Sequence, residues 1–98
     1  MSAGEPGRDG IVVRHNAAEN RFEATVDGFL SVADYEVDGE VIRFTHTWVP
    51  PELRGRGIAE KLVRAALEWA RAEGRRVVPA CSYVEAFMRR HVEFRSLL

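Results

Sequence analysis

The stretch that decides the fold is Pro50-Pro51-Glu52-Leu53-Arg54-Gly55-Arg56-Gly57-Ile58-Ala59. A proline ring removes an N–H donor and restricts the residue before it, so the two prolines end the strand that precedes them. On the other side of the loop, apolar residues recur at helical spacing, at Ile58, Leu62, Ala65, Ala66 and Trp69. The loop therefore joins a strand to an amphipathic helix, which we predict over residues 57–73.

The chain before this loop reads as antiparallel strands. The predicted strands cover residues 11–14, 21–26, 29–37 and 41–49. Asp27-Gly28 and Asp38-Gly39 separate the last three runs, and Asp-Gly between two such runs is a strong hairpin signal. The first half of the chain is thus predicted to be an antiparallel β-meander.

The chain after the helix returns to the same sheet. Gly74 stands where a C-terminal helix cap is expected, and residues 76–80 form a short apolar strand, which a right-handed crossover makes parallel to its neighbour. Ser82 and Glu85 have the spacing of a capping box and predict a last helix. Its apolar face would hold Val84, Phe87, Met88 and His91. The predicted class is α+β, in the order β-β-β-β-α-β-α.

Length and composition describe one small domain. The chain has 98 residues, of which 46% are hydrophobic and 30% charged, and a domain of this size buries about two-thirds of its surface. We predict a flexible leader over residues 1–10 and a single domain over residues 11–98. No apolar run approaches the length of a membrane span and no signal-peptide core is present, so we expect a cytoplasmic protein. A single cysteine, Cys81, excludes an internal disulfide and argues against a metal site.

Charge is divided unevenly along the chain. Residues 1–53 carry four arginines against ten carboxylates, whereas residues 54–98 carry ten basic residues against five glutamates. The basic second half suits an anion, but the acidic first half would repel a nucleic acid. We therefore expect a small anionic ligand rather than DNA or RNA.

The loop at residues 50–59 has the chemistry of a phosphate site. A helix leaves its first N–H groups without internal partners, and this loop has no Ser, Thr, Asp or Asn to cap them. Gly55 and Gly57 allow close approach of the backbone, beside the positive end of the helix dipole and next to Arg54 and Arg56. The patterns of nucleoside triphosphatases and dinucleotide-binding folds are both missing. The loop suits a pyrophosphate, although two glycines alone are more often only a tight turn.

The residues around the loop resemble the GNAT superfamily of N-acetyltransferases. Arg54-Gly55-Arg56-Gly57-Ile58-Ala59 looks like the Arg/Gln-x-x-Gly-x-Gly/Ala loop of that superfamily, in its usual place between a strand and a helix. Three further segments resemble a short, single-domain branch of the superfamily. They are Phe44-Thr45-His46-Thr47, Val49-Pro50-Pro51-Glu52-Leu53, and Val78-Pro79 with Cys81 and His91. The resemblance spans residues 11–94 and implies a minimal GNAT-like fold.

The resemblance also implies acetyl-CoA as the cofactor. Trp48 and Val49 would hydrogen-bond the pantetheine amides through their backbone. The pyrophosphate would lie on the loop, against Arg54, Gly55, Arg56, Gly57, Ile58 and Ala59. The implied reaction moves the acetyl group from the thioester to a primary amine and needs no metal. Arg75, Arg76, Arg89 and Arg90 are candidates to reach the 3′-phosphate of the ligand.

The chain departs from the superfamily at both catalytic positions. Trp48 stands where a carboxylate base is common, and Met88 stands about where a tyrosine acid is common. His46, on the same strand face as Trp48, is able to accept a proton near neutral pH or else packs in the sheet. Cys81, at the start of the last helix, is either an acyl acceptor or a small core residue. Glu52, acting through a water molecule, is a third candidate.

Taken together, these features predict a weak N-acetyltransferase. The connection at residues 15–20 is too short for the helices that enclose the acceptor in longer GNAT enzymes, so the groove would be open and would favour an exposed lysine, a polyamine or a chain terminus. The alternatives are a non-catalytic acyl-CoA-binding or protein-interaction module, and self-acylation at Cys81. We expect a monomer or weak dimer with no membrane or nucleic-acid partner.

Overall fold

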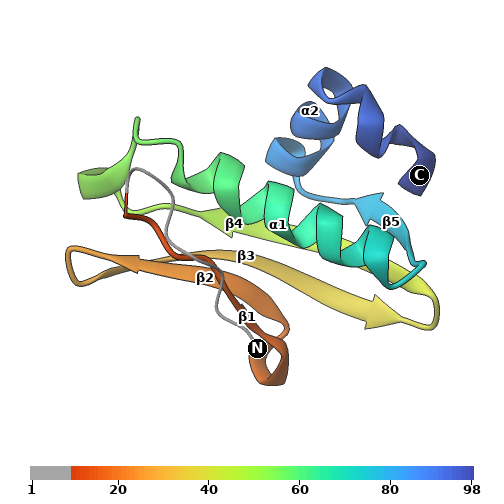
Figure 1. Cartoon of the computed structure of the whole chain (residues 1–98), viewed down its shortest axis with the longest axis horizontal. Coiled ribbons are helices and arrows are strands. Elements are labelled where there is room, and N and C mark those ends of the chain that lie inside the picture. Colours follow the sequence, from red (N-terminus) through yellow and green to blue (C-terminus); the bar gives the residue numbers. More distant parts are fainter. Residues whose placement is uncertain (1–9) are drawn as a thin grey trace.

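The structure is a computed structural model that describes residues 10–98 (Figure 1). Its strands are β1 (Arg14–Asn16), β2 (Arg21–Val26), β3 (Phe29–Asp38), β4 (Val41–Trp48) and β5 (Arg76–Pro79). Its helices are α1 (Ile58–Ala72) and α2 (Ser82–Arg90), and short 3-10 helices cover Ala17–Glu19, Pro51–Leu53 and Val92–Leu97. The predicted α+β class and element order are confirmed.

The first strand is displaced from its predicted place. Strand pairing begins at Arg14, which faces Glu23 on β2, and not at residue 11. Ile11 precedes the strand and is buried in the core. Apart from Gly10, the predicted leader lies outside the described residues.

The five strands form one sheet in sequence order, β1-β2-β3-β4-β5. The first four pair antiparallel, and β5 pairs parallel to β4, as the predicted crossover requires. At the β2–β3 hairpin both turn residues, Asp27 and Gly28, have a left-handed backbone, with φ of 53° and 82°. This is the tight turn that matches the twist of the two strands, and Asp-Gly is well suited to it.

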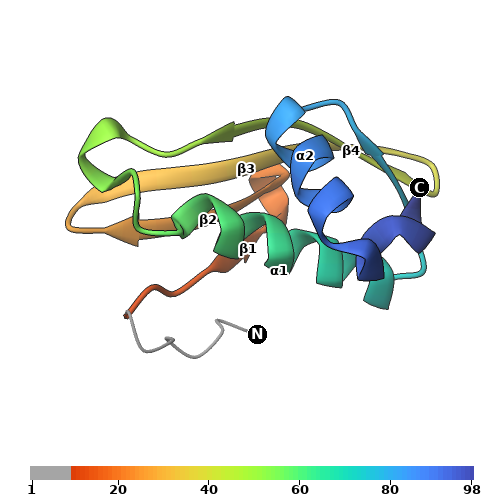
Figure 2. The same cartoon turned by 90° about the horizontal axis from the view of Figure 1, so that it is seen from above.

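Helix α1 covers one face of the sheet, and the two form two packed layers (Figure 2). The α1 side chains that are buried are Ile58, Leu62, Val63, Ala66, Leu67 and Ala70. Val63 and Leu67 were not in the predicted apolar stripe, whereas Ala65 and Trp69, which were, are only partly buried. The stripe is therefore centred slightly differently from the prediction. Gly74 follows the helix with φ of 69°, as a C-terminal cap should.

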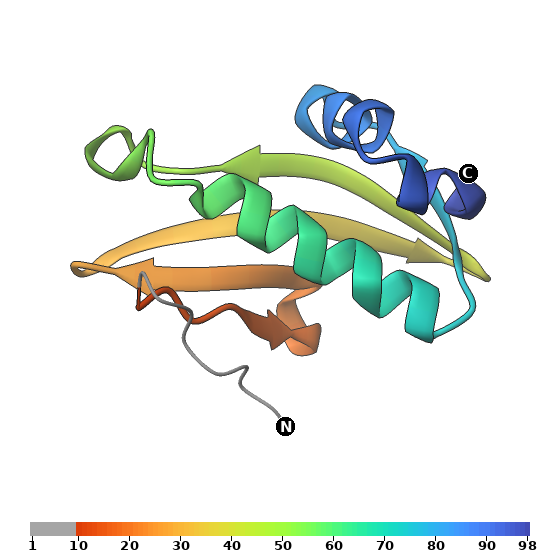
Figure 3. The ribbon, with the colours of Figure 1, turned by 45° about the horizontal axis from the view of Figure 1, so that its top comes forward.

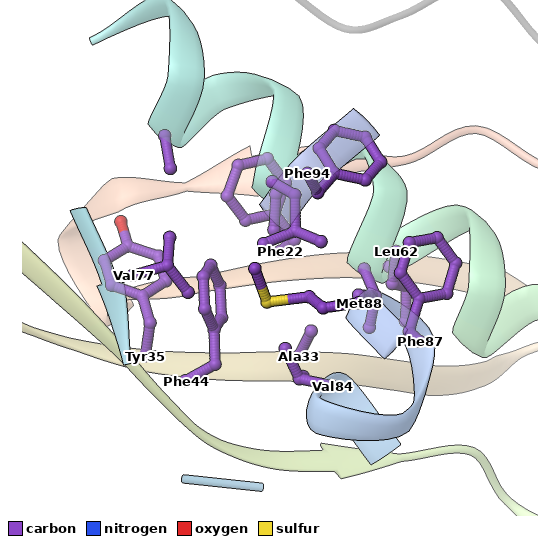
Figure 4. Packing of buried hydrophobic residues seen from close by; sticks show 14 of the residues in the cluster. Phe22, Ala33, Tyr35, Phe44, Leu62, Val77, Val84, Phe87, Met88 and Phe94 are labelled. Atoms are coloured by element: carbon purple, nitrogen blue, oxygen red, sulfur yellow. The ribbon is translucent and has the colours of Figure 1, made fainter. Parts of the chain in front are cut away.

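Helix α2 and the C-terminal 3-10 helix lie beside α1 near β5 (Figure 3). Val84, Phe87 and Met88 are buried as predicted, and Met88 projects toward Phe22 and Phe44 of the sheet (Figure 4). The predicted capping box is wrong. The N-cap is Cys81 and Ser82 is already helical, so no side chain caps the helix.

The opposite face of the sheet is bare in the part of the chain that the structure describes. Leu30, Trp48 and Val78 lie on this face and are 40%, 44% and 42% exposed. The β1–β2 connection contains only the three-residue 3-10 helix Ala17–Glu19. The open acceptor groove that the sequence suggested stays a prediction. No helix within residues 10–98 is long and apolar enough to cross a bilayer.

Candidate active site

A β-bulge in β4 decides which side chains face which side of the sheet. Asp34 pairs with His46 and Tyr35 pairs with Phe44, so Thr45 is an extra residue without a partner. Before the bulge the even-numbered residue Phe44 is buried; after it the even-numbered residues His46 and Trp48 are exposed. The bulge thus turns Thr47 toward the helices and turns His46 and Trp48 toward the bare face.

Strands β4 and β5 separate where the bulge begins. Pairing ends at Phe44 and Pro79, and the amide of Cys81 donates the last hydrogen bond to the Phe44 carbonyl at 2.8 Å. Beyond this point β4 pairs with β3 alone, along its other edge. The separation leaves backbone groups of residues 45–48 facing an opening rather than a strand, and such an edge is able to receive an extended ligand.

The loop that closes this opening is held by buried side chains at both ends. Leu53 and Ile58 are each 1% exposed. Between them, Gly55 and Gly57 have φ of 85° and 77°, in the left-handed region that disfavours side chains. Gly57 is the N-cap of α1 and supplies no side-chain hydrogen bond, so the first N–H groups of the helix have no side-chain cap, as the sequence predicted.

Both arginines of the loop contact the protein itself. The Arg54 Nε donates to the Val49 carbonyl at 3.0 Å, and its guanidinium lies 5.0 Å from the centre of the Trp48 ring. Arg56 Nη1 lies 3.0 Å from Oδ2 of Asp27, in the β2–β3 turn. Arg54 therefore lines the opening directly, whereas Arg56 is turned toward the neighbouring hairpin.

Two adjoining hollows run from the loop to the end of β4. One, of about 280 Å³, is lined by Thr47, Trp48, Val49, Arg54, Ala59 and Tyr83. The other, of about 240 Å³, is lined by Val49, Leu53, Arg54, Gly55, Gly57, Ile58, Ala59, Glu60 and Tyr83. Of the predicted cofactor residues, only Arg56 is missing from both linings. We call the two hollows together the groove.

Tyr83 is a groove residue that the sequence reasoning missed. It lies on the first turn of α2 and lines both hollows, opposite the loop. Burial raises the pKa of its phenol, the neighbouring Glu60 raises it further, and Arg90 opposes this in part. A tyrosine phenol is protonated at neutral pH even without such a shift, so Tyr83 carries a proton there, and the raised pKa makes it a weaker acid than a free phenol. The superfamily resemblance directed attention to Met88, which is buried in the core instead.

Cys81 lies beside the groove with a polarised thiol. Its Sγ is 3.5 Å from the Thr47 hydroxyl. Burial raises the pKa of the thiol, but hydrogen bonds from the Thr47 hydroxyl and from the amides of Val84 and Tyr83 outweigh this and leave the pKa below its usual value. The thiolate is the nucleophilic form of cysteine. Cys81 is thus a candidate nucleophile next to the hollow that Thr47 lines.

The other predicted residues are separated from Cys81. His46 lies on the bare face, so the bulge places it on the opposite side of β4 from Thr47 and Cys81. Glu52 is exposed in the 3-10 turn and lines neither hollow. Within residues 10–98, no three His, Cys, Asp or Glu side chains are grouped so as to hold a metal ion.

The arginines suggested for the 3′-phosphate are also separated by the fold. Arg75 and Arg76 follow the C-terminal end of the 15-residue helix α1, about 22 Å from the loop, and they donate to the carbonyls of Gly39 and Leu98. Arg89 is paired with Glu85 at 2.6 Å. Only Arg90, which acts on the pKa of Tyr83, stands near the groove.

Comparison with known proteins agrees with this geometry. The family model described as GCN5-related N-acetyl-transferase matches residues 21–97. The Bos taurus protein NATD1 is 34% identical over 82 residues, covering 81% of this chain and 73% of that protein. The Homo sapiens protein NATD1 is 32% identical, with 81% and 73% covered.

A solved structure shows the same fold. A GCN5-like protein from Staphylococcus aureus, determined by NMR in solution, has a TM-score of 0.69 and 27% identity to this chain. The match covers 87% of this chain and 84% of that one. The resemblance inferred from the loop and its flanking strand is confirmed, and the chain belongs to the family of GCN5-related N-acetyltransferases.

Proposed function

We propose that residues 11–98 form a single acetyl-CoA-binding domain that transfers the acetyl group to an exposed primary amine. The observation that carries the proposal is the groove itself. It begins at the helix N-terminus that no side chain caps and continues to the β4 edge that no strand covers, with Val49, Arg54, Ala59 and Tyr83 shared by both hollows. A pyrophosphate suits the first end and an extended amide chain suits the second.

The backbone supplies most of the binding in this proposal. The N–H groups from Gly55 to Ala59 receive the pyrophosphate, with Arg54 adding positive charge. The pantetheine amides pair with backbone groups of Trp48 and Val49. The Val49 carbonyl already accepts from Arg54, but a carbonyl oxygen has a second lone pair and is able to accept another hydrogen bond.

The chemistry requires an amine that has lost its proton and a thiolate that gains one. The amine nitrogen attacks the thioester carbonyl, and the tetrahedral intermediate expels the thiolate of CoA. Tyr83 is the groove residue able to protonate the thiolate in the second step, because its phenol lines both hollows and carries a proton at neutral pH. His46 faces the bare side of the sheet, from which an acceptor approaches freely, and is our candidate base for the first step.

A second route uses Cys81. The thiolate would attack the thioester, receive the acetyl group and release CoA, so that the acceptor reacts with an acylated protein. The lowered pKa of Cys81 and its contact with Thr47 favour this route. A non-catalytic acyl-CoA-binding module remains the alternative in which neither step occurs.

The test of binding compares two glycine variants. Gly57→Glu places a carboxylate where the pyrophosphate should lie, and Gly74→Glu makes the same change at the other end of α1, at a similar φ of 69°. Acetyl-CoA at about one hundred times its Kd adds roughly 2.7 kcal/mol of stability and should raise Tm by about 10 °C or more. We expect this rise in the parent and in Gly74→Glu but not in Gly57→Glu. No rise in the parent at millimolar acetyl-CoA would refute the proposal.

The test of chemistry follows the acetyl group by mass. We expect acetylation of a lysine peptide or a polyamine by the parent protein. A gain of one acetyl group on the protein that disappears in Cys81→Ser would favour the second route. Binding without transfer to a broad panel of amines would leave the non-catalytic module as the function.

A further inference from the structure

The ion pair between Arg56 and Asp27 sets this loop arginine apart from Arg54. The atoms Nη1 and Oδ2 lie 3.0 Å apart, and the two side chains are 43% and 69% exposed. Asp27 belongs to the β2–β3 turn, so the pair joins the loop to a hairpin that is distant in sequence. Arg56 therefore presents its charge to a carboxylate and not to the groove.

The loop does not depend on this pair for its shape. Leu53 and Ile58 are buried on either side of it, and the 3-10 turn Pro51–Leu53 and the left-handed glycines fix the backbone between them. Ion pairs as exposed as this one contribute little stability. The main effect of Asp27 on the loop is therefore electrostatic.

We propose that Asp27 competes with the anionic ligand for Arg56 and so weakens the binding of acetyl-CoA and of CoA. This inference rests on the proposed function. When the pyrophosphate reaches the loop, Arg56 must leave Asp27 to contact it, and the carboxylate that remains nearby repels the ligand. The loss of the ion pair and the repulsion by the carboxylate both oppose binding, and neither changes the fold.

The competition acts on the product as well as on the cofactor. CoA carries the same pyrophosphate after the acetyl group has left, so Asp27 weakens its hold equally. Asp27 therefore lowers the affinity of the loop for the product and for the cofactor by the same factor. Asp27 is thus a residue that tunes ligand affinity without touching the reacting atoms.

The experiment compares Asp27→Asn with Asp38→Asn. Asp27 has φ of 53°, a conformation that asparagine tolerates well, so the first variant removes the charge without straining the turn. Asp38 precedes the glycine of the other hairpin, at the far end of the ten-residue strand β3 and about 30 Å away. The two variants change the net charge equally.

We expect Asp27→Asn to bind acetyl-CoA and CoA about fivefold more tightly at low salt, as nearby like charges repel at that order, whereas Asp38→Asn should bind as the parent does. The gain should shrink as salt approaches about 1 M, where the screening length is near 3 Å. The gain in affinity from Asp27→Asn should also be smaller in a protein that already carries Arg56→Gln, because that change removes the residue for which Asp27 and the ligand compete. Isothermal titration calorimetry measures each Kd.

Three results would count against the inference in different ways. Equal or weaker binding by Asp27→Asn, with the parent binding normally, overturns the competition. A gain that is independent of salt shows a structural effect instead. No binding of acetyl-CoA or CoA by the parent or by any variant overturns the proposed function, and the inference with it.

Discussion

The backbone of Gly57 allows a stability prediction that does not depend on any ligand. Gly57 has φ of 77°, and a Cβ added there would meet no atom within 4 Å beyond its neighbours in the chain. Gly57→Ala therefore introduces backbone strain but no clash. The left-handed conformation costs an L-residue about 1–2 kcal/mol, and the loss of unfolded-chain freedom returns about 0.4–1 kcal/mol, which leaves a net loss near 1 kcal/mol.

A loss of this size lowers Tm by about 4–8 °C in a domain of this length. We would measure it by thermal and urea unfolding monitored by circular dichroism, without acetyl-CoA. Gly57→Asn is the matched control, because asparagine enters the left-handed region more easily and should lose clearly less. If Gly57→Ala were as stable as the parent, or less affected than Gly57→Asn, the loop would not have the conformation described here.

Three further predictions concern single side chains. Thr47→Val removes the hydroxyl that lowers the pKa of Cys81, so alkylation of Cys81 by iodoacetamide at pH 7.5 should slow; an unchanged rate would contradict the contact. Burial lowers the pKa of His15, so below about pH 6.5 the unfolded chain gains a proton that the fold resists. Urea unfolding should show stability falling from pH 7 to pH 5.5, and less so in His15→Gln. Tyr83→Phe should slow acetyl transfer by about tenfold or more without changing the Kd of acetyl-CoA, and an equal rate would exclude proton donation.

The hairpins and the loop were predictable because their signals are local. Asp27-Gly28 requires a turn on steric grounds, and Pro50 with Pro51 ends a strand wherever it lies. The unusual N-terminus of α1 was also visible, since the lack of a capping side chain is a property of the sequence. These features placed the groove at its correct end of the helix.

The bulge was not predictable in the same way. Ile42, Phe44, His46 and Trp48 alternate without interruption in the sequence, so a regular strand would place all four on one face. The insertion of Thr45 into the strand pairing depends on the register between β3 and β4, which no local sequence pattern indicates. The separation of His46 from Cys81, and the contact of Cys81 with Thr47, follow from that one residue.

Tyr83 and Asp27 were missed for different reasons. The capping box placed the last helix one residue late, and the position after Cys81 was read as a cap rather than as the start of a helical face toward the groove. An aromatic residue with a hydroxyl, two positions after the predicted nucleophile, was the available signal. The pairing of Asp27 with Arg56 joins residues 29 apart in sequence and needs the folded chain to be seen.

The short connection between β1 and β2 bears on how larger proteins can be built from this sheet. Ala17–Glu19 are exposed and contain no buried side chain, and the chain turns back through Asn20 in a left-handed conformation. Because the entropy of closing a loop grows only slowly with its length, a helical insert here would cost little and would interrupt no strand. The same sheet thus tolerates an added segment at one surface turn, and such an addition would leave the core as it is.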